Sequence, residues 1–219
     1  MRVLKLKLFQ ETACYKKPFA FKTWETHPLP PYSTVIGMLH SILNAEEYIS
    51  MSISVQGNYE SKFTNFQSIY FYKPKEITKM PLNIHLLYNV NLIIHVRAEN
   101  EILEEIVFGI KNLNEHLSLG RKEDLVRIDE VKFVEVKEID IDELDDGRKI
   151  ECPIYIPIEQ LPEDVWGISY RLNWKYKVIN GLRQWEKINV KYVESGEIIS
   201  YDNFLQDEEG DLIYFNTPL

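Results

Sequence analysis

The sequence predicts an α+β fold built mainly from β-strands. Segments in which apolar and polar residues alternate, the pattern of a strand with one buried face, recur along the chain, whereas only two segments carry apolar residues at helical spacing. The chain has 219 residues, of which 45% are hydrophobic and 27% are charged, as in ordinary globular proteins. A chain of this length is expected to bury one sizeable core, alone or with a smaller satellite.

The first predicted elements are a strand and a helix. In residues 3–9 leucines alternate with Lys5 and Lys7, which predicts a strand with one buried face and one basic face. A helix is predicted over residues 34–44, with Ser33 as its N-cap. Runs rich in β-branched and aromatic residues then predict strands over residues 49–55, 63–72 and 84–96.

A second helix over residues 102–115 and a strand over 125–136, irregular near Asp129 and Glu130, complete the first part. The order strand, helix, strand, strand, helix, strand is that of a modified ferredoxin-like βαββαβ domain with an extra strand pair inserted before residue 84. We assign this domain to residues 1–138, an acidic loop or boundary to 139–150, and a small C-terminal β-rich region to 151–219. In that region, Asn180-Gly181 predicts a two-residue hairpin turn.

Charge is distributed unevenly along the chain. The net charge is −9, but residues 1–37 carry six Lys or Arg against two Asp or Glu, and residues 165–193 carry six against one. The intervening and C-terminal segments are acidic. A polyanion would therefore bind at one of the two basic islands, because steering and contact depend on where charge lies more than on its total.

The first basic island is the main candidate for binding nucleic acid. It combines cations with aromatic rings and leads to a helix N-terminus, which favours anions. Lysines hold phosphates while aromatic faces stack bases. The candidate RNA-binding residues of this island are Lys16, Lys17, Phe21, Lys22, Trp24, Ser33 and Thr34. The alternative is a solvated basic loop whose aromatic side chains cover the core.

A second candidate surface is one face of the hairpin around Asn180-Gly181. Strand alternation gathers six basic and aromatic side chains there: Trp174, Tyr176, Arg183, Trp185, Lys187 and Lys191. The face either stacks bases or packs on the main domain, and for the two tryptophans we expect a structural or partner-facing role. After the second helix, Gly120 and Arg121 either form a helix C-cap or contact RNA phosphate.

Few residues suit catalysis. His27 is the only histidine in the basic loop, and with Lys22 it could supply the base and the cation of a metal-independent ribonuclease, with Tyr15 or Tyr32 replacing one of them. The two cysteines match no metal-ligand spacing, so we expect no metal and no other cofactor. No signal peptide or long apolar run is found, so we expect a cytoplasmic protein without membrane contact.

Two motifs resemble a known family. They are Phe19-Ala20-Phe21-Lys22 leading to Leu29-Pro30-Pro31-Tyr32-Ser33-Thr34-Val35-Ile36-Gly37-Met38-Leu39, and Leu119-Gly120-Arg121-Lys122-Glu123-Asp124-Leu125-Val126. Together with the strand order, they resemble CRISPR-associated family five, the RAMP-type (RRM-like) subunit of Cascade complexes, in its type I-B form. The likeness covers most of residues 1–137, whereas the C-terminal third shares only its short strands.

The resemblance implies a non-catalytic CRISPR RNA-binding subunit of an antiviral interference complex. Such a subunit grips the 5′ handle of the crRNA and contacts the repeated backbone subunit, the large subunit and, through the complex, target DNA. By the motif match, Lys22 and residues 30–34 would lie on the handle, with Gly120 and Arg121 near the same groove. A type I-C branch of the family instead trims precursor RNA with Tyr, Lys and His side chains, so a metal-independent endoribonuclease is the alternative. This chain lacks the Lys-His pair expected of that branch.

Overall fold

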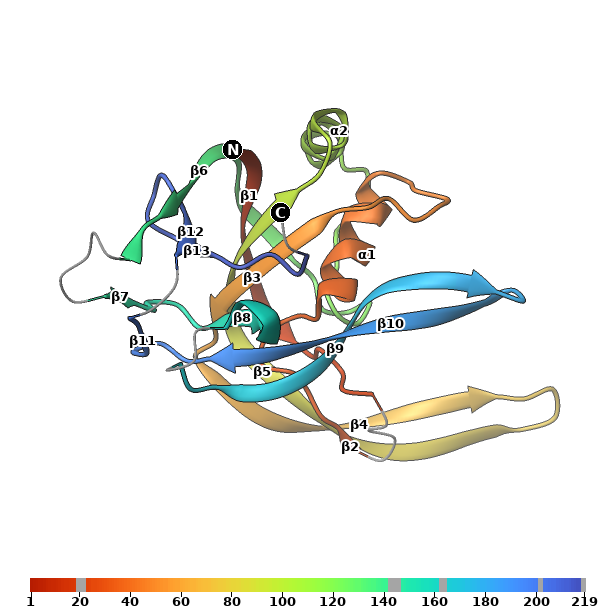
Figure 1. Cartoon of the computed structure of the whole chain (residues 1–219). Coiled ribbons are helices and arrows are strands. Elements are labelled where there is room, and N and C mark those ends of the chain that lie inside the picture. Colours follow the sequence, from red (N-terminus) through yellow and green to blue (C-terminus); the bar gives the residue numbers. More distant parts are fainter. Residues whose placement is uncertain (19–22, 142–146, 162–164, 201–202, 218–219) are drawn as a thin grey trace.

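The computed structural model describes residues 1–18, 23–141, 147–161, 165–200 and 203–217, and it confirms the α+β class. Eleven strands form one sheet, whose central part runs in the order β6 (Arg127–Ile139), β1 (Arg2–Ala13), β5 (Ile77–Arg97) and β3 (Ser52–Asn58), all antiparallel. Figure 1 shows the two helices, α1 (Tyr32–Ile42) and α2 (Asn100–Lys111). Both contribute buried apolar side chains to the core formed with these strands.

The C-terminal strands extend this sheet at both edges. β8 (Ile154–Pro157), β10 (Leu182–Val193) and β9 (Ile168–Ile179) continue it beyond β3, while β12 (Phe204–Asp207) and β13 (Leu212–Ile213) continue it beyond β6. The remaining elements are β2 (Thr23–Trp24), β4 (Ser61–Tyr72), β7 (Arg148–Lys149), β11 (Ile198–Ile199) and the short 3₁₀-helix η2 (Ile158–Gln160). Residues 151–219 therefore share both the sheet and part of the main core with the first half of the chain.

Two long hairpins leave the sheet on the same side of the molecule (Figure 1). One joins β4 to the first half of β5, and the other joins β9 to β10. The predicted hairpin turn is confirmed, because Ile179 pairs with Leu182 and both turn residues have positive φ, 52° at Asn180 and 73° at Gly181. The irregularity predicted near Asp129 is also confirmed, since Lys7 pairs with Glu130 and Leu8 with Ile128, which leaves Asp129 as the extra residue of a bulge.

Both predicted helix caps are wrong. α1 begins at Tyr32, and its N-cap is Pro31, whose carbonyl accepts hydrogen bonds from the backbone N–H groups of Thr34 (2.9 Å) and Val35 (3.3 Å). Ser33 therefore lies inside the first turn, because proline pre-sets a backbone angle suited to starting the helix two residues earlier than predicted. α2 ends at Lys111, nine residues before Gly120, so Gly120 caps no helix.

The predicted basic face of the first strand is also wrong at Lys5, whose side chain is fully buried. The turn between β12 and β13 brings three carboxylates, Asp207, Glu209 and Asp211, onto its ammonium. The Nζ–O distances are 2.5 Å to Asp207 and 2.7 Å to Glu209. Burial alone would lower the pKa of Lys5, but these hydrogen bonds hold it above its ordinary value, so the ammonium stays charged.

No helix in the described part of the chain is long and apolar enough to cross a membrane.

Candidate nucleic-acid interface

The first basic island doubles back on itself beside the β4–β5 hairpin. β2 adds to β5 as a parallel strand, with Trp24 opposite Ile84, and the backbone N–H of Lys17 donates to the carbonyl of Glu25 (2.8 Å). Lys16 pairs with Thr26 in an isolated bridge. We call Lys16, Lys17 and Trp24 the basic segment. Phe21 and Lys22, the other candidates of this island, lie outside the described residues.

The two lysines of the basic segment differ in their surroundings. The ammonium of Lys16 lies 4.3 Å from the centre of the Trp24 ring and, within the described residues, has no carboxylate partner. Trp24 itself packs against Leu82 and Ile84. The ammonium of Lys17 is 3.3 Å from a carboxylate oxygen of Glu25 and 5.7 Å from the ring centre of Tyr170 on β9. The basic segment thus lies between the two hairpins, close to where they leave the sheet. The positive charge of Lys16 remains available to an anion.

Gly120 and Arg121 belong to a turn beside the basic segment. The buried carboxylate of Asp124 accepts a hydrogen bond from the backbone N–H of Cys14 (3.0 Å), which places this turn at the end of β1, next to Lys16. Gly120 has φ of 114°, and a Cβ there would lie 2.9 Å from the same carboxylate, so only glycine fits. The structure therefore places the second sequence motif beside the basic segment.

The side chain of Arg121 is engaged within this turn. Its Nη2 lies 2.6 Å from Oδ1 of Asp124 and its Nε 3.0 Å from Oδ2, while the side chain is only 10% exposed. A bidentate pair of this kind occupies the donors that would otherwise face phosphate. The geometry supports a role for Arg121 in holding the turn.

Ser33 and Thr34, both half-buried, lie in the first turn of α1. Ser33 lines a groove between α1 and β9 instead of joining the basic segment, and no hydrogen bond or ring contact in the described part of the chain links either residue to Lys16, Lys17 or Trp24. The predicted candidates are thus divided between two places on the surface.

His27 is a core residue, 5% exposed, with its ring 5.3 Å from that of Tyr170. Burial and the nearby charge of Lys17 lower the pKa of His27 to about 4. Tyr15 and Tyr32, the alternative partners, are also buried, and burial raises the pKa of both phenols. None of the three side chains is exposed to an RNA strand.

The lowered pKa of His27 predicts a pH-dependent stability. The folded chain resists protonation that the unfolded chain accepts near pH 6.5, so stability is lost as the pH falls from about 6.5 towards about 4. Urea unfolding measures the fall in the free energy of unfolding between pH 7 and pH 4.5. We expect this fall to be about 2.5 kcal/mol smaller in His27→Phe than in the wild type. The exposed His116 is the control, and an equal effect of His116→Phe would contradict this assignment.

Four of the six residues predicted on one hairpin face come together: Trp174, Tyr176, Arg183 and Trp185 all line the groove against α1. Lys187 and Lys191 do not line it. The pairing of β9 with β10 shifts between Glu186 and Lys187, and this bulge breaks the alternation on which the prediction depended.

A row of exposed aromatic rings on β4 went unnoticed in the sequence. Phe66, Tyr70 and Tyr72 are 68%, 50% and 79% exposed, and their even spacing places them on one face of the strand. Lys79 of β5 lies 5.7 Å from the ring centre of Tyr70. Exposed rings beside a cation are features that proteins use to stack the bases of single-stranded nucleic acid. The even spacing of these aromatic residues in the sequence could have predicted that their rings share one face of the strand.

Comparisons with known proteins bear on this arrangement. A family model described as "CRISPR-associated protein (Cas_Cas5)" matches residues 3–180. The chain belongs to this family. Both motifs that resembled CRISPR-associated family five lie inside the matched range. No curated protein matches the chain.

One solved structure shares the fold of this Cas5-family chain, and two others resemble it more weakly, all at low sequence identity. A chain of a "CRISPR RNA-guided surveillance complex" is 14% identical with a TM-score of 0.57, and the match covers 90% of each chain. A "CRISPR protein from Archaeoglobus fulgidus" is 10% identical, with a TM-score of 0.47 over 97% of this chain and 98% of that one. A structure named "Cas protein" is 16% identical, with a TM-score of 0.47 over 90% of this chain and 99% of that one.

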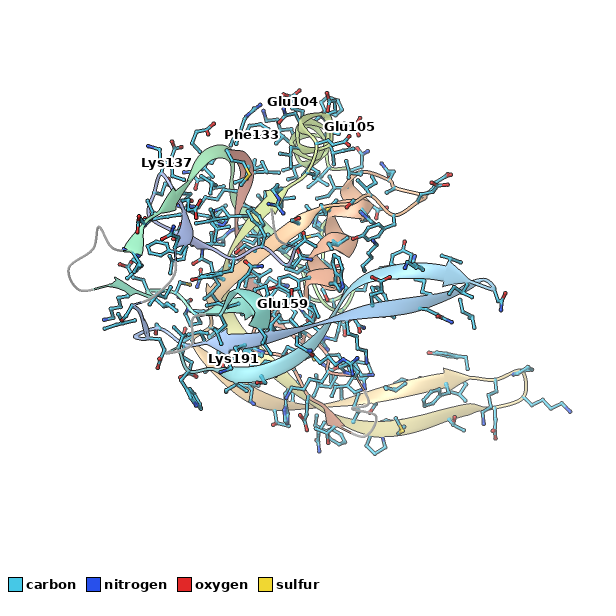
Figure 2. All side chains as sticks on the ribbon, viewed as in Figure 1. Glu104, Glu105, Phe133, Lys137, Glu159 and Lys191 are labelled. Atoms are coloured by element: carbon cyan, nitrogen blue, oxygen red, sulfur yellow. The ribbon has the colours of Figure 1, made fainter. Side chains whose placement is uncertain are left out.

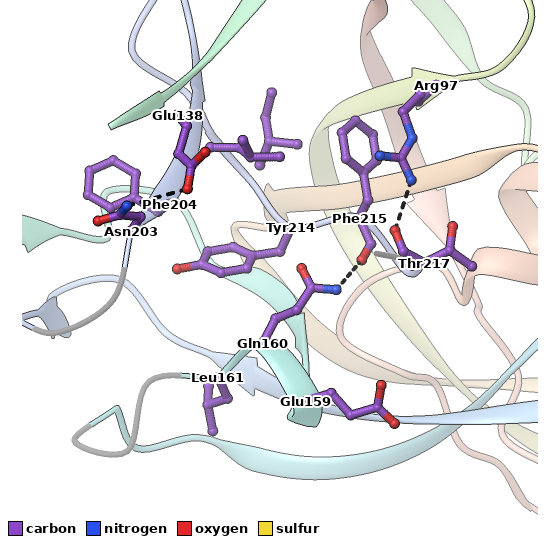
Figure 3. Close-up of a pocket in the computed structure, with 12 residues that line it drawn as sticks. Arg97, Glu138, Glu159, Gln160, Leu161, Asn203, Phe204, Tyr214, Phe215 and Thr217 are labelled. Carbon is purple, nitrogen blue, oxygen red and sulfur yellow. Dashed lines mark hydrogen bonds between the residues drawn. The ribbon is translucent and has the colours of Figure 1, made fainter. Parts of the chain in front are cut away.

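Two further features of this family member are unsuited to RNA phosphate. A cavity of about 370 Å³ between η2 and β12–β13 carries the carboxylates of Glu138 and Glu159 on its wall (Figure 3). The carboxylates of Asp207, Glu209 and Asp211 lie close enough together for a metal ion, but the ammonium of Lys5 binds all three. The basic segment remains the surface best suited to a polyanion.

Proposed function

We propose that this protein is a non-catalytic CRISPR RNA-binding subunit of a type I, I-B-like, Cascade complex, in which it grips the 5′ handle of the crRNA. The observation that carries this proposal is the basic segment of a Cas5-family chain, where the Lys16 ammonium lies on the Trp24 ring without a carboxylate partner among the described residues. The turn that contains the second motif lies beside it. The crRNA handle, the repeated backbone subunit, the large subunit and, through them, target DNA are the proposed partners.

The test is handle binding by variants that remove charge from the basic segment. Lys16→Ala combined with Lys17→Ala is expected to weaken binding to repeat-derived handle RNA and to lower the slope of log affinity against log salt by about 0.7 for each phosphate that is no longer neutralised. Base preference should remain, because phosphate contacts carry no sequence information. Lys22→Ala is expected to act in the same direction.

A matched control removes two lysines elsewhere. Lys137→Ala with Lys149→Ala changes net charge equally, and both residues are exposed (Figure 2 labels Lys137). The control should leave the salt slope unchanged. Equal slopes for the two double variants would contradict a basic segment that binds phosphate, and absence of handle binding by the wild-type chain, alone and in the assembled complex, would refute the proposed function.

We also propose that the chain does not cleave RNA. General acid–base catalysis needs a base within hydrogen-bond reach of the 2′-hydroxyl. The buried positions of His27, Tyr15 and Tyr32 support this proposal. Incubation of the purified chain with precursor repeat RNA, with and without chelator, should yield no site-specific product. Cleavage abolished by His27→Ala would favour the metal-independent endoribonuclease instead.

A further inference from the structure

A groove of about 360 Å³ lies between α1 and the β9–β10 hairpin. We call it the α1–β9 groove. One wall comes from α1 and the turn after it, and the other is aromatic and comes mainly from the hairpin. The lining residues used below are Ser33, Gly37, Ser41, Asn44, Arg183 and Trp185. Its volume is within the range of small-ligand sites.

The aromatic wall of the groove is rigid and partly open. The ring of Tyr176 makes edge-on contacts with Tyr48 (5.7 Å between ring centres) and with Trp185 (5.3 Å). Such contacts hold the rings at fixed angles. Trp185 is nevertheless 39% exposed. An indole held in place with a large exposed area is suited to stacking against another flat ring.

Arg183 supplies an uncompensated positive charge at this wall. Its guanidinium lies 4.6 Å from the ring centre of Tyr176, and within the described residues no carboxylate pairs with it. Arg2, Arg121 and Arg127, by contrast, are each paired with a carboxylate. A guanidinium stacked on one ring and free of an anion is well placed to contact phosphate.

The helical wall leaves room for a ligand. Gly37 lies in the middle of α1, where glycine costs about 0.5–1 kcal/mol relative to alanine. A Cβ at Gly37 would meet no atom within 4 Å, so core packing does not require the glycine. Ser33, Ser41 and Asn44 border the same space, and in the described part of the chain their side chains make no hydrogen bond. These polar groups can read the edge of a base.

We propose that the α1–β9 groove is a nucleotide site, in which one base of a single-stranded RNA stacks on Trp185 and its phosphate contacts Arg183. This role replaces the structural or partner-facing one that the sequence suggested for Trp185. The site is separate from the basic segment and rests on the proposed function that the chain binds RNA. A nucleotide is favoured over a protein side chain because the groove combines a flat aromatic surface, an unpaired cation and free hydroxyl and amide groups. The segment that forms its aromatic wall, residues 165–193, is also basic in sequence.

The test fills the groove from Gly37. Gly37→Leu places a side chain in open space, whereas Gly37→Ala adds only a methyl group and is the matched control. Handle RNA carrying 2-aminopurine at one position at a time is titrated with each variant. For the wild type and Gly37→Ala, one position should show strong fluorescence quenching by stacking. For Gly37→Leu and for Arg183→Ala, affinity should fall roughly tenfold or more, and in Gly37→Leu the quenching should disappear.

The possible outcomes separate this inference from the proposed function. If the wild type does not bind handle RNA, the proposed function fails. If the wild type binds and Gly37→Leu binds with the same affinity and the same quenching, the groove assignment is overturned while the proposed function survives. Normal RNA binding by Gly37→Leu together with failed assembly with the protein subunits would assign the groove to a protein segment, which also overturns the nucleotide site.

Discussion

Replacing Lys5 with methionine is expected to destabilise the protein by about 3–5 kcal/mol, because it removes the cation that the buried carboxylate of Asp207 shares with the partly exposed carboxylates of Glu209 and Asp211. Lys5 and Asp207 are both fully buried at their side chains, and Asp207 also accepts a hydrogen bond from Nε2 of His95 (3.0 Å). The interaction that the substitution removes joins the first strand to the C-terminal turn, 202 residues away. Urea unfolding at pH 7 measures the change.

The control lies two residues along the same strand. Lys7 contacts Glu130 and Glu209 at 3.1 and 3.2 Å, but its side chain is 40% exposed, so Lys7→Met should cost less than about 1 kcal/mol. Acid should narrow the difference between Lys5→Met and the wild type. In the wild type, hydrogen bonds from Lys132 and Lys5 lower the pKa of Glu209 to about 2. The wild type therefore loses stability as the pH falls below about 4.5, where the unfolded chain takes up a proton at Glu209 more readily than the folded chain does. Equal losses for Lys5→Met and Lys7→Met would contradict a buried ion cluster.

Arg121→Ala is expected to lower the free energy of unfolding by a similar amount, about 3–5 kcal/mol, because Asp124 is fully buried and would lose its bidentate partner. Asp124 also holds the backbone of Cys14, so the turn and the end of β1 should loosen together. Thermal and urea unfolding measure the loss. Handle binding by Arg121→Ala should decline in proportion to the unfolded fraction.

Arg127 offers the matched control for Arg121. It pairs with Asp129 at 2.5 Å, but its side chain is 66% exposed, so Arg127→Ala should leave the free energy of unfolding almost unchanged. An Arg121→Ala variant with wild-type stability and a specific loss of handle binding would show that Arg121 contacts phosphate directly, as the sequence motif suggested. The structure favours the stabilising role.

Local sequence patterns predicted the individual elements well because their causes are local. Alternating leucines in β1, the apolar spacing of α1 and α2, and Asn180-Gly181 each depend on neighbours within a few residues. The bulge at Asp129 was visible for the same reason. Helix ends were less predictable, because Pro31 and Ser33 are both good starting residues and the local sequence does not choose between them.

The sequence by itself determined the α+β class, the two basic islands and the resemblance to the family whose model matches residues 3–180. Only the tertiary structure decided what the charged and aromatic side chains do. The sequence does not distinguish Lys5 from Lys16, or Arg121 from Arg183. In the structure, however, Lys5 and Arg121 are paired with carboxylates, whereas Lys16 and Arg183 lie on aromatic rings. The physical reason is that the path of the folded chain decides which partners reach a charge. The carboxylates around Lys5 come from more than 200 residues away, and Asp124, although only three residues from Arg121, reaches it through the fold of the turn, so the sequence spacing did not reveal these contacts.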